Sequence, residues 1–426
     1  MMDYQQAVSF LIDHFPQYQK IGIEAYKPFP HRMLSLANWL GNPQDQFPGI
    51  HIAGTNGKGS VAHMLAAVFQ HAGLRTGLYT SPHVLDFRER IKVNGHVISK
   101  EEVVGFIERF RTERMESLGG ELPSFFDMTT AMAFRYFADK KVDVAVIETG
   151  LGGRLDSTNI LTERSVKLSV ITNIGLDHCD LLGDSVEKIA YEKAGIIKKH
   201  VPLVVGEYDP GSFPVLEKKA REAEAPLFRA FERPDEPYLI EGNTLYQQKN
   251  LKTVLSALDI LRKTTPVFSS LLTQEIIAGG LEHFETMTGL HGRWEHLGEH
   301  PAVIADTGHN AHGLRYLKDQ LARESYKELY IVFGVVQGKD LAGIAPLLPG
   351  DAYYFFTQAS IPRALPFRQL ADWGKATGLK GEAVPNVKEA FEKARNKASR
   401  EDLILVGGST FTIADLMENF FCREKN

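Results

Sequence analysis

Short apolar segments alternate with longer segments of helical periodicity along most of the chain. Residues 49–54 ("GIHIAG") form a continuous apolar run that predicts a buried strand. Residues 58–72 carry apolar side chains at helical spacing, and Gly73 stands where a C-terminal helix cap is expected. The same alternation continues downstream: strands are predicted at 75–81, 142–148, 168–175 and 202–208, and helices at 99–114, 124–138, 185–197 and 250–263. This alternation is typical of a parallel α/β sheet.

A second series of alternating elements begins after Pro301. Strands are predicted in "AVIADTG", "ELYIVFGVV", "DAYYFFTQ" and "DLILVGG", with helical segments between them. Glycine and polar residues interrupt the periodicity in "HGRWEHLGEHP", which places the domain boundary there. We therefore predict an α/β protein with an N-terminal P-loop-type parallel-sheet domain (1–292), a hinge (293–300) and a smaller Rossmann-like C-terminal α/β domain (301–426).

Composition and charge narrow the class of protein. A chain of 426 residues is long enough for two domains, and 24% charged residues is ordinary for a globular protein. A net charge of −5 gives no reason to expect a nucleic-acid or membrane partner. Cys179 and Cys422 are too few for a disulfide framework, and the first residues lack a basic leader before an apolar run. We expect a cytoplasmic monomer that acts on small molecules.

The stretch "HIAGTNGKGS", residues 51–60, resembles a phosphate-binding loop in a modified form. A standard loop reads G-x-x-x-x-G-K-[ST], whereas here Gly59 separates Lys58 from Ser60. Glycines let backbone amides close around oxygen atoms, the following helix adds its partial positive charge, and the lysine adds a full one. A glycine-rich turn with a surface lysine is the alternative, which the flanking strand and helix make less favourable.

Polar side chains stand at the ends of three other predicted strands. Glu148 ends one strand, Ser81 ends another, and Asp177 and His178 follow a third. The carboxyl ends of parallel strands meet at one sheet edge, where α/β proteins bind ligands. Oxygen ligands of this kind suit Mg²⁺. Each residue alone could equally cap a loop, and Lys193, inside a predicted helix, would by itself be a solvated charge.

Taken together, seven motifs resemble the folylpolyglutamate synthase/dihydrofolate synthase family, which belongs to the Mur-ligase-like ATP-dependent amide ligases. The resemblance runs in order over nearly the whole chain. The motifs are "HIAGTNGKGS", "TSPH", "ETGLGGRLDSTN", "ITNIGLDH", "EKAGIIK", "HGRWE" and "DTGHNAHG". The resemblance implies that ATP phosphorylates a substrate carboxylate and that the amino group of L-glutamate attacks the acyl phosphate. Catalysis would then depend on positioning and charge neutralisation.

The resemblance also implies roles for individual residues. Lys58, Glu148, His178, Lys193 and His309 would be catalytic, with Lys193 carried as a carbamate. Ser81, Glu148 and His178 would hold Mg²⁺, while Phe126 and Asp156 would contact the pterin of a folate or dihydropteroate substrate. The expected ATP contacts are Gly54, Thr55, Asn56, Gly57, Lys58, Gly59, Ser60, Asn250, Arg293 and Asp306.

Several alternatives stay open at this point. A peptidoglycan-precursor ligase of the Mur type would usually carry a further domain before the phosphate loop, and only about fifty residues precede it here. A P-loop NTPase or phosphotransferase would need no glutamate. A non-catalytic ATP-binding module would tolerate loss of Glu148, His178 or Lys193. Within the family, polyglutamylation with dihydrofolate synthesis is favoured over either reaction alone.

Overall fold

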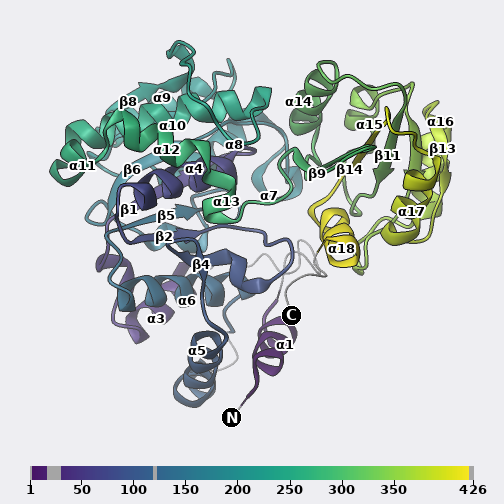
Figure 1. The fold of residues 1–426 in the computed structure, drawn as a ribbon. Helices are drawn as coiled ribbons and strands as arrows, with labels where there is room; N and C mark the ends of the chain where they lie inside the picture. Colours follow the sequence, from purple (N-terminus) through teal and green to yellow (C-terminus); the bar gives the residue numbers. More distant parts are fainter. Residues whose placement is uncertain (1, 17–29, 119–121, 422–426) are drawn as a thin grey trace. The chain divides into compact units, whose positions relative to one another are not determined.

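The computed structural model describes residues 2–16, 30–118 and 122–421. The chain forms two compact units, Met1–Leu290 and His291–Asn426. Each unit is built on its own sheet with helices on both faces (Figure 1). Among the described residues, every helix falls short of the length and apolar character that crossing a membrane requires.

The sheet of the first unit has eight strands in the order β4-β3-β2-β5-β1-β6-β7-β8. The six strands from β2 to β8 in this order run parallel, while β3 and β4 pair antiparallel at one edge. The strands are β1 (Gly49–Ala53), β2 (Thr76–Tyr79), β3 (Ile91–Val93), β4 (His96–Val97), β5 (Val144–Glu148), β6 (Val166–Ile171), β7 (Leu203–Val205) and β8 (Leu227–Arg229). The strand β1 thus lies at the centre, with its neighbours β5 and β6 reached by separate crossovers.

Alternation along the buried strands directs side chains into two cores. On β5, Val144 and Val146 pack into one core, and Ala145 and Ile147 pack into the other. The first core is covered by α4 (Lys58–His71), α10 (Leu245–Thr264), α11 (Pro266–Leu271), α12 (Gln274–Glu282) and α13 (Phe284–Thr288). Helices α1 (Tyr4–His14), α3 (Pro30–Trp39), α5 (Lys100–Glu113) and α6 (Phe125–Asp139) cover the second core, and α8 (Val186–Lys193) and α9 (Phe213–Glu222) cover a third core beyond β1.

The sheet of the second unit has six strands in the order β13-β12-β11-β14-β10-β9. All pairs are parallel except β9 with β10. The strands are β9 (Glu295–Glu299), β10 (Ala302–Asp306), β11 (Leu329–Phe333), β12 (Tyr353–Phe356), β13 (Lys380–Ala383) and β14 (Leu403–Gly407); the helices are α14 (Ala311–Leu321), α15 (Leu341–Ile344), α16 (Phe367–Ala376), α17 (Val387–Lys397) and α18 (Thr410–Phe420). Most of the segment expected to be a hinge therefore forms the antiparallel edge strand β9.

The predicted α/β class with two parallel-dominated sheets is confirmed. The carboxyl ends of β1, β2, β5 and β6 are the positions where the sequence placed its candidate residues. The chain passes from β1 to strands on one side of it and later to β6 on its other side. The order of the strands therefore reverses between β1 and β6, and sheets of this kind bind ligands at such a point.

Candidate functional site

The loop after β1 is a tight turn that requires its glycines. A methyl group on Gly54 would lie 1.8 Å from Thr172 Oγ1, and one on Gly57 would lie 2.4 Å from Asn250 Oδ1. Gly57 has a φ of +79° and precedes the first residue of α4, so side chains other than hydrogen are strained there. The first backbone amides of any α-helix have no acceptor within the helix, so those of α4 can donate to a ligand.

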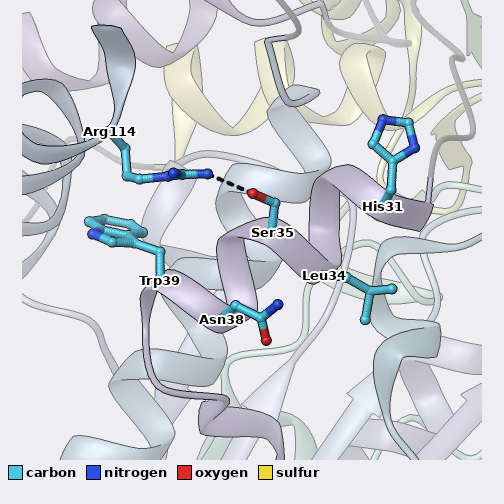
Figure 2. Close-up of a pocket in the computed structure, with 6 residues that line it drawn as sticks. All are labelled: His31, Leu34, Ser35, Asn38, Trp39 and Arg114. Carbon is cyan, nitrogen blue, oxygen red and sulfur yellow. Dashed lines mark hydrogen bonds between the residues drawn. The ribbon is translucent and has the colours of Figure 1, made fainter. Parts of the chain in front are cut away.

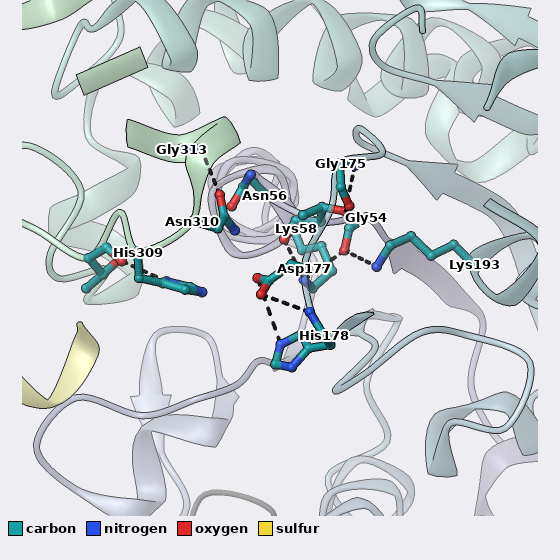
Figure 3. Close-up of polar contacts among 12 residues, drawn as sticks. Gly54, Asn56, Lys58, Gly175, Asp177, His178, Lys193, His309, Asn310 and Gly313 are labelled. Atoms are coloured by element: carbon teal, nitrogen blue, oxygen red, sulfur yellow. Dashed lines mark hydrogen bonds and ion pairs between the residues drawn. The ribbon is translucent and has the colours of Figure 1, made fainter. Parts of the chain in front are cut away.

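Two lysines converge on this loop from different parts of the chain. Lys58 Nζ donates to the carbonyl oxygen of Gly54 at 2.9 Å and to that of Thr55 at 3.2 Å. Lys193 Nζ, from the end of α8, donates to the same Gly54 oxygen at 2.7 Å (Figure 3). From the sequence pattern alone, Lys193 was expected to be a solvated charge, yet its side chain is buried against the loop.

Burial makes the charged form of Lys193 unfavourable. Desolvation, reinforced by the nearby Lys58 ammonium, lowers the pKa of Lys193 to about 7, although Asp177 and Asp156 act in the opposite direction. Close to neutral pH a large share of Lys193 is therefore the neutral amine. A neutral amine can act as a nucleophile, which an ammonium cannot.

The segment after β6 holds the phosphate loop in place. The Oδ1 atom of Asn173 accepts a hydrogen bond from the amide of Asn56 at 2.9 Å, and Thr172 Oγ1 donates to the Asn56 carbonyl at 2.6 Å. Thr55 Oγ1 accepts from the amide of Gly175 at 3.0 Å. Within the motif "ITNIGLDH" only Asp177 and His178 were predicted to be site residues, so Thr172 and Asn173 were missed.

Asn173 is held by a further residue that the sequence did not single out. Its Nδ2 donates to Glu207 Oε1 at 3.0 Å, and Glu207 follows β7. The other oxygen of Glu207 accepts from Lys249 Nζ at 3.1 Å. Polar residues just past β6 and β7 would have been the only available signal, since their contacts join residues far apart in the chain.

Glu148 and Ser81 come together at the ends of neighbouring strands. Glu148 closes β5 and is 3% exposed, and its Oε2 accepts a hydrogen bond from the Ser81 amide at 3.1 Å. His178 has a φ of +52°, and its amide donates to Asp177 Oδ1 at 3.0 Å. In the described ranges of the chain, no three His, Cys, Asp or Glu side chains form a ready metal-binding cluster.

Ser60 supplies a buried hydroxyl oxygen in the first turn of α4, directly after the phosphate loop. Its side chain is 1% exposed, and its hydroxyl has no hydrogen-bond partner among the described residues. A buried hydroxyl without a partner is unfavourable, which is a reason to expect a ligand oxygen or cation beside it. In phosphate loops the residue at the start of the helix contacts the metal of a bound nucleotide.

The two residues expected at the pterin belong to the segments that come before and after β5 in the chain. The ring of Phe126 packs against Tyr79 with centroids 5.8 Å apart and covers Gly150. Asp156 is buried and caps its own loop, because its oxygens accept from the amides of Leu151 at 2.8 Å and Thr158 at 3.0 Å. Burial raises the pKa of Asp156.

In the second unit, Asp306 organises the residues expected to serve the reaction. It ends β10, and its two oxygens accept from the amides of Trp294 at 2.9 Å and Gly308 at 2.7 Å. Arg293 precedes Trp294, and His309 follows Gly308 with its Nδ1 2.9 Å from the Thr307 carbonyl oxygen. Asp306 therefore binds the backbone beside both Arg293 and His309.

A separate hollow of about 520 Å³ lies over α3, away from the residues above. Figure 2 shows Arg114 reaching Ser35, whose Oγ lies 2.6 Å from Arg114 Nη2. It is lined by His31, Leu34, Ser35, Asn38, Trp39 and Arg114. None of the residues predicted to bind ATP, metal or substrate lines it.

Comparison with known proteins identifies the family of the chain. Residues 52–260 match the Mur ligase middle domain, and residues 292–410 match the Mur ligase glutamate ligase domain. The dihydrofolate synthase/folylpolyglutamate synthase of Bacillus subtilis is 30% identical, over 97% of this chain and 98% of its own. The chain belongs to the folylpolyglutamate synthase/dihydrofolate synthase family of Mur ligases.

Two solved structures of this family have the same fold. FolC of E. coli in complex with DHPP and ADP superposes with a TM-score of 0.85 at 28% identity, covering 100% of this chain and 99% of that one. The bifunctional folylpolyglutamate synthase/dihydrofolate synthase of Yersinia pestis, complexed with AMPPNP and Mn ion, gives a TM-score of 0.82 at 28% identity, covering 98% of each chain. The protein is thus a ligase of this family.

Proposed function

We propose that the protein joins L-glutamate to the carboxylate of a pterin-containing substrate in an ATP-dependent reaction, and that it carries out both dihydrofolate synthesis and folylpolyglutamate synthesis. The observation that carries this proposal is the convergence of Lys58 and Lys193 on a glycine-rich loop beside the buried Glu148. The family of the chain and the DHPP and ADP held by its relative support the substrates.

The reaction has two steps. A carboxylate oxygen of the pterin substrate attacks the terminal phosphorus of ATP, ADP leaves, and an acyl phosphate forms. The amine of glutamate then attacks the acyl carbon, phosphate leaves, and the amine loses a proton. Residues Gly54–Ser60 hold the phosphates with backbone amides, and Lys58 neutralises their charge. No covalent bond to the protein is needed.

The donor set fits a magnesium ion. The Ser60 hydroxyl, which has no partner among the described residues, and the buried Glu148 carboxylate are hard oxygen ligands at the loop, and we assign Ser81 and His178 as further ligands. Bound there, Mg²⁺ would neutralise charge on the phosphates. A carbamate on Lys193 would add an anion in place of a cation, and the position of its amine against Gly54 favours this assignment.

The remaining predicted residues complete the proposal. Asn250 lies against Gly57 and contributes to ATP binding. Phe126 packs on the loop that follows β5, Asp156 belongs to that loop, and both contact the pterin. Residues 1–290 form the ATP- and pterin-binding part, and residues 291–426 form the glutamate ligase part. From the latter, Arg293 and Asp306 contact ATP, and His309 takes part in the reaction.

A product-resolved assay tests this function. Purified protein is incubated with Mg²⁺-ATP and glutamate together with dihydropteroate, tetrahydrofolate or no pterin, and ADP and new amide are both measured. We expect amide with each pterin, little ADP without one, and loss of both products in Lys58→Ala. Consumption of ATP without amide, equal in all three mixtures, would instead support a P-loop NTPase.

A further inference from the structure

A histidine stands in the middle of the buried central strand β1. All five residues of β1 are buried, and the side chain of His51 lies on the face opposite to Ile50 and Ile52. Burial, with a smaller contribution from Lys198, holds the pKa of His51 well below its ordinary value, so the ring is neutral. A neutral imidazole has one donor and one acceptor, and buried groups of this kind normally have partners.

The partner of His51 is a hydroxyl that itself holds a carboxylate. His51 Nε2 lies 2.8 Å from Thr158 Oγ1, and both residues are 0% exposed. The Thr158 hydroxyl donates its single hydrogen to Asp156 Oδ1 at 2.5 Å, so His51 Nε2 carries the ring hydrogen and donates to Thr158. His51 Nδ1 is then an acceptor, and it has no partner among the described residues. Two successive hydrogen bonds thus lead from β1 to Asp156.

The carboxylate of Asp156 receives further hydrogen bonds from its own loop. Its Oδ1 also accepts from the Thr158 amide at 3.0 Å, and its Oδ2 accepts from the Leu151 amide at 2.8 Å. Burial raises the pKa of Asp156, whereas these hydrogen bonds, that of the Thr158 hydroxyl first among them, favour the ionised form. Loss of the hydroxyl would therefore make the negative charge of Asp156 less favourable at this position.

The loop that contains Asp156 is also held by α6. Ser157 Oγ donates to Asp127 Oδ1 at 2.6 Å, and Asp127 lies in the first turn of α6. The same turn carries Phe126, whose ring covers the start of the loop. These contacts fix the loop as a whole, whereas the Thr158 hydroxyl acts on the carboxylate of Asp156 itself.

We propose that His51 and Thr158 are positioning residues for the pterin substrate, and that their two successive hydrogen bonds hold the carboxylate of Asp156 in a fixed orientation for the N–H groups of the pterin ring. The inference rests on the proposed function, because it requires that Asp156 contacts the pterin. An ionised carboxylate accepts stronger hydrogen bonds, and a fixed one loses less freedom when the substrate binds. Both residues should therefore affect pterin binding and leave ATP binding unchanged.

The test measures the two substrates separately in matched variants. His51→Leu and Thr158→Val remove the two hydrogen bonds in turn, while His51→Gln keeps an N–H donor near the position of Nε2 and Thr158→Ser keeps the hydroxyl. Thr288→Val is the control, because Thr288 is equally buried and its hydroxyl contacts His63 and a backbone carbonyl instead of a carboxylate. Calorimetry gives dissociation constants for AMP-PNP with Mg²⁺ and for dihydropteroate in their presence, and amide formation gives KM values.

We expect Thr158→Val to raise the dissociation constant and the KM for dihydropteroate by about tenfold to 150-fold, the range for a hydrogen bond to a charged group. His51→Leu should raise both by about threefold to tenfold, because it acts through the neutral hydroxyl. AMP-PNP affinity and the KM for ATP should stay at wild-type values in both variants. Thr158→Ser and His51→Gln should regain most of the lost affinity, and Thr288→Val should bind dihydropteroate as wild type does.

A double-mutant cycle separates this role from ordinary packing. In Asp156→Asn, which lacks the negative charge, the further change Thr158→Val or His51→Leu should weaken dihydropteroate binding little, because contacts that act on one group are not additive. Fully additive losses, or an equal loss in Thr288→Val, would overturn the inference.

Other results also overturn the inference. A parallel loss of AMP-PNP affinity would make His51 a support of the phosphate loop instead. If His51→Leu fails to fold, Thr158→Val leaves β1 unchanged and is held to the same outcomes. A wild-type protein that neither binds dihydropteroate nor forms amide from it contradicts the proposed function itself, whereas one that does both, with the same affinity as Thr158→Val, removes only this inference.

Discussion

The carbonyl oxygen of Gly54 accepts hydrogen bonds from two lysine side chains, the buried Lys193 and the partly buried Lys58. Two ammonium groups at one oxygen repel each other, and the lowered pKa of Lys193 relieves that repulsion. The proposed carbamylation would take this further, because the neutral amine would attack the carbon of CO₂, lose a proton and become an anion. A residue that the sequence pattern alone assigns to solvent would thus gain a chemical role from its surroundings.

Lys193→Met is expected to lose nearly all ligase activity, with partial recovery in the presence of short carboxylates. The ¹³C NMR signal of a carbamate, formed with labelled bicarbonate, should be present in wild type and absent in this variant. Because protonation blocks reaction with CO₂, the signal should decline as the pH falls below about 7. Lys188→Met, on the exposed side of α8, is the control; an unchanged signal in Lys193→Met would exclude the carbamate.

Glu148→Gln should weaken the response to magnesium without unfolding the protein. Glutamine still accepts the hydrogen bond from the Ser81 amide but lacks the negative charge that a hard cation requires. We expect the Mg²⁺ concentration at half-maximal activity to rise by about tenfold or more, the cost of losing a charged ligand. A magnesium titration that coincides with that of wild type, and with that of the exposed Glu222→Gln, would contradict this assignment.

At the level of elements, the phosphate loop depends on a second loop for its shape. The segment after β6 supplies Thr172 and Asn173, and Glu207 after β7 fixes Asn173 in turn. Three successive strand ends of the sheet therefore support one another. The nucleotide loop is preorganised before any ligand is bound, which reduces the entropy lost on binding.

Asn173→Ala should raise the KM for ATP more than it lowers kcat. The variant leaves the amide of Asn56 without its acceptor, and a lost partner of this kind costs about 1–3 kcal/mol. We expect the KM for ATP to increase by roughly fivefold to 150-fold, as that energy implies. Asn386→Ala, which removes the N-cap of α17 in the second unit, should change stability only; equal KM values in both variants would refute the role of Asn173.

The strands that carry the phosphate loop and Glu148 could be predicted because they are short apolar runs followed by helical periodicity. The same logic fails for β13, whose residues 380–383 (KGEA) include no large apolar side chain and are mostly exposed, and for β8 and α9, which lie in a stretch that is mixed in pattern. The supporting role of Asn173 could not be predicted either. Its contact to Asn56 joins residues 117 positions apart, and local patterns carry no information about such a pair.

At the level of the whole molecule, the chain divides its assigned residues between two units that each have a sheet of their own. The phosphate loop, its two lysines and the Glu148 carboxylate lie in residues 1–290. Arg293, Asp306 and His309 lie in the second unit. A measurement that resolves the chain into segments, such as hydrogen exchange, can therefore report on each unit separately.

Hydrogen exchange should locate nucleotide binding. Saturating AMP-PNP with Mg²⁺, at one hundred times its dissociation constant, stabilises the folded form it binds by about 2.7 kcal/mol. We expect slower exchange over β1, the start of α4 and the segment after β6. Lys58→Ala should lose this protection. Protection confined to residues 380–420 would place the nucleotide elsewhere.

The sheet order has a consequence for how the protein can be altered. Strand β8 is separated from β1 by β6 and β7, and β13 is separated from β10 by three strands. Substitutions in the outer strands β8 and β13 should therefore be tolerated. A peptide tag or reporter can be inserted into the turns beside these strands. Attachment of the enzyme to a support should therefore use the turns beside β8 and β13 and leave the carboxyl ends of the central strands unchanged.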